Sequence, residues 1–387
     1  MDKFDAHEAA QKIMDALQKE YKDLTALNVM ILGKTGVGKS TLINNMFNQK
    51  MAETGVGKPV TRQIRKITKP NFPLAIYDTP GLELGGENAL ETLLDEVTGE
   101  IDKGIKSGDI SKAIHCIWYC ISTTSHRFEQ AEIDFMKSFL GRTSEYDIPV
   151  IVVLTQSYSK KDAKALMSEI EKENLPIVNI VPVLAENYEI DEEYTAKAYG
   201  LERLSDVMNS VIPEAVQKTF VSVQKVNLEL KKERAQAVVA MSAAAAALTG
   251  AIPIPFSDAA ALVPEQIAML AKITAVFGIP IEKGTITAIV SSTIATAGTT
   301  LLGKTIVASL IKFIPGAGSV AGSIISASTA AALTAALGEA YILILTMISN
   351  GELKLSDLET DKGKKKINQV FTDQLKVKRN AHGEKVE

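Results

Sequence analysis

Eight residues near the N-terminus have the types and the spacing to bind a phosphate chain. From Gly33 to Ser40 they follow the order glycine, four residues, glycine, lysine, serine, between the apolar run 29–32 and a helix-like stretch. Glycines let the backbone turn sharply and direct successive N–H groups inward, which makes an anion-binding nest at a helix N-terminus. In such a loop the Lys39 ammonium reaches the β- and γ-phosphates and the Ser40 hydroxyl ligates Mg²⁺. The alternative, a glycine-rich turn that binds nothing, fits these flanks less well.

A second motif follows at the end of the strand-like run 74–77. It reads Asp78-Thr79-Pro80-Gly81, and a glycine-rich loop that contains Thr61 lies between it and the phosphate loop. An aspartate at the carboxyl end of a strand, close to a glycine that can approach a γ-phosphate, is what a sensor of a magnesium–nucleotide complex needs. The two motifs together predict a nucleoside triphosphate site.

Alternating apolar runs and helix-like stretches surround these motifs. Strand-like runs lie at 29–32, 63–68, 74–77, 113–121, 149–154 and 177–183, and helical patterns lie at 88–106, 128–140, 162–173 and 198–211. Continuous apolar strands that alternate with helices favour a mostly parallel sheet with helices on both faces. Ligands of such sheets bind at the carboxyl ends of the strands, which is where both motifs stand.

The composition is that of a globular protein with two domains. The chain has 387 residues, 46% hydrophobic and 23% charged, with a net charge of -4. No excess of positive charge therefore argues for nucleic acid. Cys116 and Cys120 lie four residues apart on one strand, too distant to bond to each other, so we expect reduced thiols in a cytoplasmic protein. The charged N-terminal segment lacks the apolar core of a signal peptide.

The two ends of the chain read as helical. Apolar residues at helical spacing predict an amphipathic helix over residues 3–24, which we expect to pack against another domain, with a membrane surface as the alternative. Residues 214–234 predict one charged helix. Three uncharged runs follow at 235–257, 284–303 and 313–338. Their length suits a membrane span, but the large apolar residues of the second run share one helical stripe, which favours a buried helical core. The lysine-rich segment 361–387 could attract anionic lipids and is expected to be a solvated end.

These motifs carry a family resemblance. The phosphate loop, Thr61, the tetrapeptide 78–81 and the Arg127-Phe128 pair resemble the Era-like branch of the P-loop GTPases. The flanking helices and the segment 54–61 are similar to the immunity-related GTPases and their bacterial relatives. The resemblance implies that Thr61 completes the Mg²⁺ shell and senses the γ-phosphate, that Asp78 holds Mg²⁺ through water, and that the Gly81 N–H contacts the γ-phosphate. The candidate catalytic residues are then Lys39, Thr61 and Gly81, and the candidate metal ligands are Ser40, Thr61 and Asp78.

The nucleotide-binding residues follow from the same resemblance. They are Gly33, Lys34, Thr35, Gly36, Val37, Gly38, Lys39, Ser40, Thr41, Asp78, Gly81, Thr155, Gln156 and Ala185. One departure concerns the base. Where the family has asparagine, lysine, any residue and aspartate, this chain has Thr155-Gln156-Ser157-Tyr158, so the carboxylate that accepts from guanine is missing. Its loss lowers guanine affinity or selectivity by about 10- to 100-fold unless another acid replaces it, and Glu186 and Asp162 are the candidates. The Ala185 N–H remains placed for the guanine oxygen.

A second departure concerns catalysis. Ras-like enzymes orient the attacking water with a glutamine just after the aspartate-x-x-glycine motif, and this chain has Leu82 there. Leucine neither donates nor accepts a hydrogen bond, so we expect slow intrinsic turnover that self-assembly or a partner stimulates.

The sequence thus predicts an α/β P-loop GTPase domain joined to an all-α domain. The expected divisions are an N-terminal helix (1–27), the GTPase domain (28–213), a hydrophobic helical domain (214–350) and a charged tail (351–387). The expected reaction is Mg²⁺-dependent hydrolysis of GTP, coupled to assembly as a homodimer or higher oligomer or to membrane lipids, in the cytoplasm and without nucleic acid. The alternatives are a nucleotide-gated binding module with negligible hydrolysis and a ribosome-associated GTPase.

Overall fold

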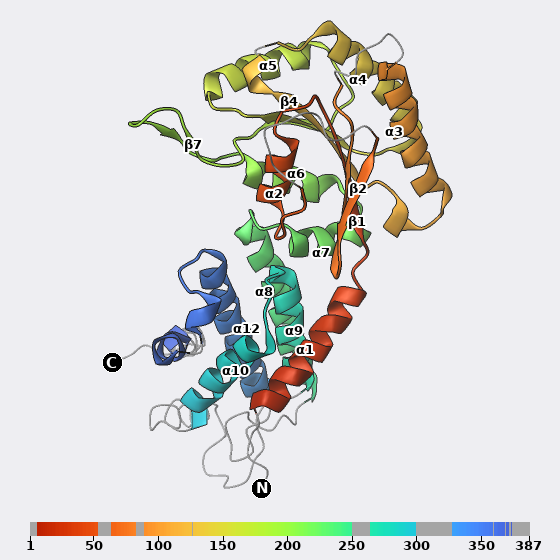
Figure 1. Ribbon diagram of the computed structural model, residues 1–387. Coiled ribbons are helices and arrows are strands. Elements are labelled where there is room, and N and C mark those ends of the chain that lie inside the picture. Colours follow the sequence, from red (N-terminus) through yellow and green to blue (C-terminus); the bar gives the residue numbers. More distant parts are fainter. Residues whose placement is uncertain are drawn as a thin grey trace. The chain divides into compact units, whose positions relative to one another are not determined.

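The computed structural model divides into two units (Figure 1). The sheet unit is Leu24–Asn227, and the helical unit joins Met1–Asp23 to Leu228–Glu387. The structure describes residues 6–52, 63–82, 89–125, 127–249, 264–298, 327–358, 360–367, 369–370 and 373. The loop with Thr61 and the whole of the stretches 250–263 and 299–326 lie outside these residues.

A six-stranded sheet forms the centre of the sheet unit. Its strands are β1 (Leu27–Leu32), β2 (Arg65–Lys69), β3 (Phe72–Asp78), β4 (Cys116–Ser122), β5 (Val150–Thr155) and β6 (Asn179–Pro182). Their order is β2-β3-β1-β4-β5-β6, and all pairs are parallel except β2 with β3. Every residue of β1, β4 and β5 is buried, as the continuous apolar runs predict. The predicted fold, a mostly parallel α/β sheet with an added helical region, is confirmed.

Helices cover both faces of this sheet (Figure 1). They are α2 (Lys39–Met46), α3 (Ala89–Lys106), α4 (Gln130–Thr143), α5 (Lys160–Lys172), α6 (Leu201–Val211) and α7 (Glu214–Val223). On one face, side chains of α3, α4 and α5 share a core with alternate strand residues such as Met30, Tyr119 and Val152. On the other, Trp118 stacks on Phe47, which directly follows α2, at 5.9 Å between ring centroids.

Two buried cysteines lie in the central strand β4. Cys116 and Cys120 are both free, as the sequence predicts. Burial raises the pKa of each thiol to about 12. Because the thiolate is the reactive form, neither cysteine is a nucleophile at neutral pH.

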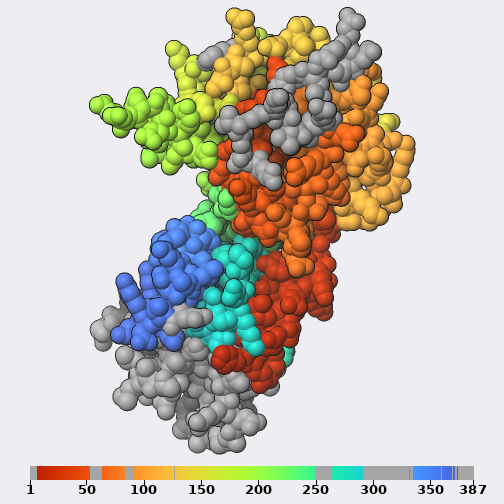
Figure 2. Space-filling view, in the orientation of Figure 1, coloured from red at the N-terminus to blue at the C-terminus, as the bar shows by residue number. Residues whose placement is uncertain are grey.

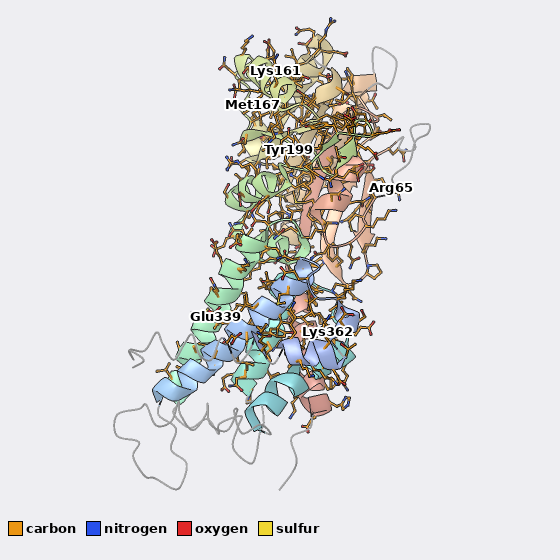
Figure 3. The ribbon with its side chains drawn as sticks, turned by 90° about the vertical axis from the view of Figure 1, so that its left-hand side faces the viewer. Arg65, Lys161, Met167, Tyr199, Glu339 and Lys362 are labelled. Carbon is orange, nitrogen blue, oxygen red and sulfur yellow. The ribbon has the colours of Figure 1, made fainter. Side chains whose placement is uncertain are left out.

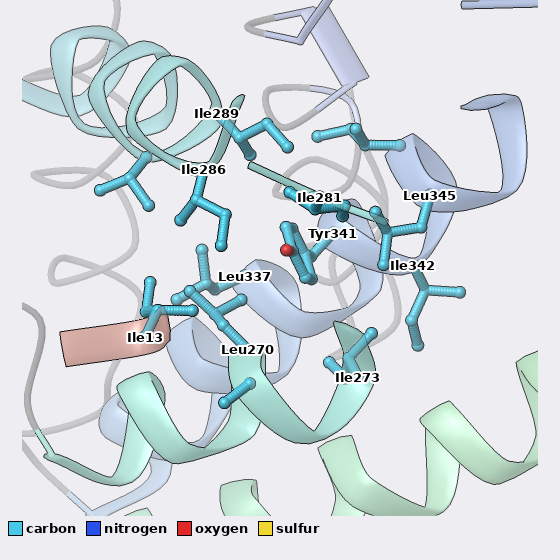
Figure 4. Close-up of a cluster of buried hydrophobic side chains, with 14 of the residues drawn as sticks. Ile13, Leu270, Ile273, Ile281, Ile286, Ile289, Leu337, Tyr341, Ile342 and Leu345 are labelled. Carbon is cyan, nitrogen blue, oxygen red and sulfur yellow. The ribbon is translucent and has the colours of Figure 1, made fainter. Parts of the chain in front are cut away.

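The helical unit brings the N-terminal helix α1 together with helices of the C-terminal half of the chain. Among its described helices are α1 (Ala6–Lys22), α8 (Leu228–Thr249), α9 (Pro264–Phe277), α10 (Lys283–Gly298) and α12 (Ala327–Ser349). The α1 helix packs on α9 and α10, and buried side chains such as Ile13, Leu270 and Leu345 form one core (Figure 4). Gly338 of α12 lies against α8, where a Cβ would be 2.5 Å from a methyl of Val239. The absence of a side chain thus sets the approach of these two helices.

One expectation about the C-terminal half is wrong. The single charged helix over 214–234 is two helices, because the Gln224 side chain accepts hydrogen bonds from the N–H groups of Val226 and Asn227 and stabilises a turn between α7 and α8. In the described start of the lysine-rich segment, Ile367 is buried in the core of the helical unit while Lys362, Lys365 and Lys366 are exposed, so the expectation of a solvated end stays a prediction. Among the described residues, no helix has the length and apolarity to cross a bilayer.

The divisions of the chain also differ from the expected domains. The α7 helix lies in the sheet unit, where it contacts β1 and β3, and the Thr219 hydroxyl donates to the Thr25 carbonyl at 2.6 Å. In the helical unit, the buried Lys231 ammonium donates to the carbonyls of Val276 and Phe277 at 3.0 and 2.8 Å, and thus caps the end of α9. Burial lowers the pKa of Lys231 well below its ordinary value.

The buried side chain of His115 should make the stability of the sheet unit depend on pH. His115 Nδ1 accepts from the Asn28 N–H at 2.9 Å, and its Nε2 lies 2.8 Å from the Ile110 carbonyl, which fixes the neutral ring. Burial lowers the pKa of His115. The unfolded chain, with a pKa of about 6.5, therefore takes up a proton that the folded chain resists. We expect the free energy of unfolding to fall as the pH drops below about 6.5, by at most about 1.4 kcal/mol per pH unit from this group.

The fluorescence of Trp118, the one tryptophan of the chain, reports unfolding of the sheet unit in urea. His115→Gln is the control, because it removes the titrating group at the same position. If the free energy of unfolding of His115→Gln fell between pH 7 and 5 as steeply as that of the wild type, the pH dependence would not come from His115.

Candidate nucleotide site

The phosphate loop stands at the carboxyl edge of the sheet. It begins after β1, which lies between β3 and β4, and it ends at the first turn of α2. From β1 the chain continues to strands on one side of the sheet, β2 and β3, whereas from β4 it continues to strands on the other side, β5 and β6. The connections therefore diverge between β1 and β4. Open parallel sheets bind their ligands at such a point. The phosphate loop therefore lies at the ligand-binding edge of the sheet, between a strand and a helix, as its motif requires.

Three glycines give the loop its shape. Gly33, Gly36 and Gly38 have φ of 139°, 77° and 91°, values that residues with a side chain rarely adopt. At Gly33 the space is closed as well, since a Cβ would lie 2.3 Å from the Cys120 carbonyl oxygen. The loop can therefore pass close to the end of β4 only with glycine at this position.

Lys39 lies across the loop that precedes it. Its ammonium donates to the carbonyl oxygens of Gly33 at 2.7 Å and Lys34 at 3.0 Å. These bonds hold a positive charge over the loop, beside the N-terminus of α2. Both the charge and the helix N-terminus favour an anion at this place.

Lys34 ties the loop to helix α4. Its ammonium lies 2.7 Å from a carboxylate oxygen of Glu129 and 3.0 Å from one of Glu132, whose side chain is only 5% exposed. Burial disfavours the charge of Lys34, but the bonds to the two acids outweigh this effect and raise its pKa. Sequence reasoning missed both acids, because nothing in the spacing of residues so distant in the chain indicates this contact.

The candidate oxygen ligands for Mg²⁺ lie on neighbouring elements. Asp78 ends β3 beside Ile31 of β1, and the N–H and hydroxyl of Thr79 donate to the Ile31 carbonyl at 3.3 and 3.0 Å. Ser40 is half-buried in the first turn of α2. A hydroxyl and a carboxylate are the hard ligands that Mg²⁺ prefers, so the donor set fits this metal. Gly81 is buried just after Asp78, whereas Thr61 lies outside the described residues.

The loop after β5 contacts the phosphate loop. Gln156 adopts a left-handed φ of 51°, and its amide donates to the Gly36 carbonyl at 3.1 Å while its side-chain oxygen accepts from the Ser122 hydroxyl. The Thr155 hydroxyl donates to the Ile121 carbonyl at 3.1 Å. Residues at or just after the carboxyl ends of β1, β4 and β5 thus meet at one edge of the sheet. The remaining loop residues, Thr35, Val37 and Thr41, lie within or directly after the phosphate loop.

Comparisons with known proteins place this arrangement in a family. The family model described as "Septin" matches residues 23–216, half of the chain. The chain belongs to the septin family. A second model, described as "Domain of unknown function (DUF697)", matches residues 216–379, so a septin-type P-loop GTPase domain is followed by a region of another kind.

Individual relatives and solved structures align with about half of the chain. Cell division control protein 11 of Saccharomyces cerevisiae is 27% identical and aligns with 47% of this chain and 50% of its own. GTPase Era of Pseudomonas fluorescens is 30% identical, over 48% of this chain and 55% of its own. A crystal structure of Aquifex aeolicus Era bound to GDP·AlF4⁻ is 21% identical over 59% of this chain and 69% of its own, with a TM-score of 0.34. The chain spans a quarter to a half of the length of the first curated relatives it matches.

The septin-type domain of this chain keeps both departures in its site. Leu82 is 7% exposed and belongs to the core between the sheet and α3. Tyr158 follows the strand β5 where a base-reading carboxylate is expected, and Ala185 is half-buried after β6. The resemblance to Era-like GTPases is supported by these relatives, whereas the likeness to the immunity-related GTPases stays a prediction.

Proposed function

We propose that this protein hydrolyses GTP to GDP and phosphate with Mg²⁺, and that the reaction serves as a conformational switch. The observation that carries the proposal is the phosphate loop, with three glycines at positive φ and the Lys39 ammonium on its own carbonyls. Membership of the septin family supports a guanine nucleotide as the ligand.

Each residue of the site has a role in this proposal. Ser40 and Asp78 hold Mg²⁺, which neutralises the charge on the β- and γ-phosphate oxygens when it is bound. Lys39 stabilises the same oxygens, and loop N–H groups orient the phosphate chain. Thr61 and the Gly81 N–H close on the γ-phosphate and separate from it after hydrolysis.

Slow turnover follows from the side chain at Leu82. It is buried in the core, so it offers the attacking water no hydrogen bond. We expect that a second copy of the chain or a partner supplies the missing group, and that hydrolysis accelerates on assembly. In this proposal the helical unit couples the nucleotide state to self-assembly or to association with a membrane surface.

Phosphate release from MgGTP at increasing protein concentration tests the proposal. We expect the rate per molecule to rise with concentration or on addition of anionic liposomes, and a chelator of Mg²⁺ to abolish it. Sedimentation and liposome flotation in GTP and in GDP then identify which association the nucleotide controls. Retention of GTP with no phosphate release in a single turnover would favour a binding module instead. A chain that retains no nucleoside triphosphate at millimolar concentration would overturn the proposal.

A further inference from the structure

Tyr158 occupies the position where a GTPase of this kind reads its base. It is the third residue after β5, and Gln156 of the same loop bonds to the phosphate loop, so a nucleotide held there extends toward this loop. Guanine presents two neighbouring donors, the ring N1–H and the amino group. A carboxylate accepts from both, whereas a neutral phenol has a single oxygen. Guanine recognition therefore needs an acid from elsewhere.

A second loop is tied to this one. It follows β6 and leads into the hairpin of β7 (Tyr188–Glu189) and β8 (Thr195–Ala196). The Ser157 N–H donates to the Val183 carbonyl at 3.2 Å, and the Tyr199 hydroxyl donates to the Ser157 carbonyl at 3.0 Å. The hairpin protrudes from the surface of the sheet unit (Figure 2). Tyr199, whose hydroxyl makes the second of these bonds, is labelled in Figure 3.

The aromatic rings of the two loops also meet. Tyr158 and Tyr188 have ring centroids 4.3 Å apart, at an angle of 43°. Tilted rings at this distance attract each other, so the hairpin base is held against the loop after β5. The pair also offers an apolar wall on which a purine could lie.

Hydrogen bonds hold the chain on both sides of Glu186 in the second loop. On one side, Leu184 exchanges two backbone hydrogen bonds with Tyr199, each of 3.0 Å; on the other, the Asn187 side-chain oxygen accepts from the Ala198 N–H at 2.9 Å. Glu186 itself is exposed, and it directly follows Ala185. Burial raises the pKa of the Tyr158 phenol, and electrostatic interactions with Tyr188 and Glu186 raise it further, so the phenol stays neutral. Glu186 stands two residues before Tyr188, whose ring contacts that of Tyr158, so it lies close to the position of the missing acid.

We infer that Glu186 is the specificity-determining residue for guanine, with its carboxylate accepting from N1–H and the amino group beside the Tyr158–Tyr188 pair. The acid has moved from the loop after β5 to the loop after β6. This inference rests on the proposed function, since it names the base of the same triphosphate. Asp162 is the competing acid, and it lies in the first turn of α5.

Calorimetric titration with the magnesium complexes of GTP, ITP, XTP and ATP tests the assignment. The full chain should bind GTP about 10-fold or more tightly than XTP, because each bond to a charged acceptor changes affinity by about that factor. ITP, which lacks the amino group, should bind with intermediate affinity. In Glu186→Gln the order of GTP and XTP should reverse, since an amide donates where the carboxylate accepted. Tyr158→Asp in the Glu186→Gln background restores a carboxylate and should restore the preference for GTP.

Glu189→Gln is the matched control, because it neutralises an exposed acid of the same hairpin and should leave all four affinities unchanged. Trp118 fluorescence in urea shows that each variant is folded. An unchanged ratio of GTP to XTP affinity in Glu186→Gln would overturn the inference, as would reversal in Asp162→Asn instead. A wild-type chain that binds all four triphosphates equally would overturn it while the phosphate site stands. Failure to bind any triphosphate would instead remove the proposed function.

Discussion

Replacing Lys39 by methionine is expected to weaken MgGTP binding by about 100-fold or more. The ammonium now on the Gly33 and Lys34 carbonyls would contact two phosphate groups, and hydrogen bonds to charged groups contribute about 1.5–3 kcal/mol each. Phosphate release should fall at least as far, because the same charge stabilises the transition state. Isothermal titration calorimetry and a phosphate-release assay measure the two effects.

The control for Lys39 is Lys164→Met, which removes a lysine from an exposed position on α5. Its affinity for GTP should equal that of the wild type. Because Lys39 bonds to only two loop carbonyls, we expect Lys39→Met to remain folded, with a loss of stability of about 1 kcal/mol. A Lys39→Met chain that binds MgGTP as tightly as the wild type would show that the loop holds no triphosphate.

Alanine at Gly33 is expected to destabilise the sheet unit by roughly 2–5 kcal/mol, from backbone strain together with overpacking. The new Cβ would lie 2.3 Å from the Cys120 carbonyl oxygen, so the end of β1 must move away from β4. Gly36→Ala is the matched control. It has a positive φ of 77° but nothing within 4 Å of the new Cβ, so only about 1–2 kcal/mol of strain is expected. Urea unfolding followed by Trp118 fluorescence compares the two. Equal stabilities would refute the close approach of the two strands.

Local sequence patterns predicted most of the sheet unit. The phosphate loop, the aspartate at the end of β3 and the buried strands each carry a signal within a few residues, such as glycine spacing or a continuous apolar run. Helix α6, for example, was expected over 198–211 and begins at Leu201 after a left-handed Gly200. Predictions of this kind depend on steric and hydrophobic rules that act along the chain.

Contacts between distant residues could not be predicted in the same way. Lys34 finds Glu129 and Glu132 only because the sheet brings α4 to the phosphate loop. The turn at Gln224 depends on a side chain that accepts two backbone bonds in place of a continuing helix. Ile367 is buried although lysines surround it, because the apolar residue alone reaches the helical core. Each outcome is decided by tertiary packing, which overrides local propensity.

The pairing of α1 with α9 and α10 has a consequence for biosynthesis. At the translation rates of living cells, roughly 10 to 50 s separate the emergence of α1 from that of α9 at the ribosome. The whole of Leu24–Asn227 is made in that interval and can fold, since its own first and last segments are joined through Thr25 and Thr219. The apolar stripe of α1 meanwhile has no native partner. The apolar face of α1 therefore stays exposed on the nascent chain after the sheet unit has been made. A chaperone that binds exposed apolar helix faces would act on α1 during this interval.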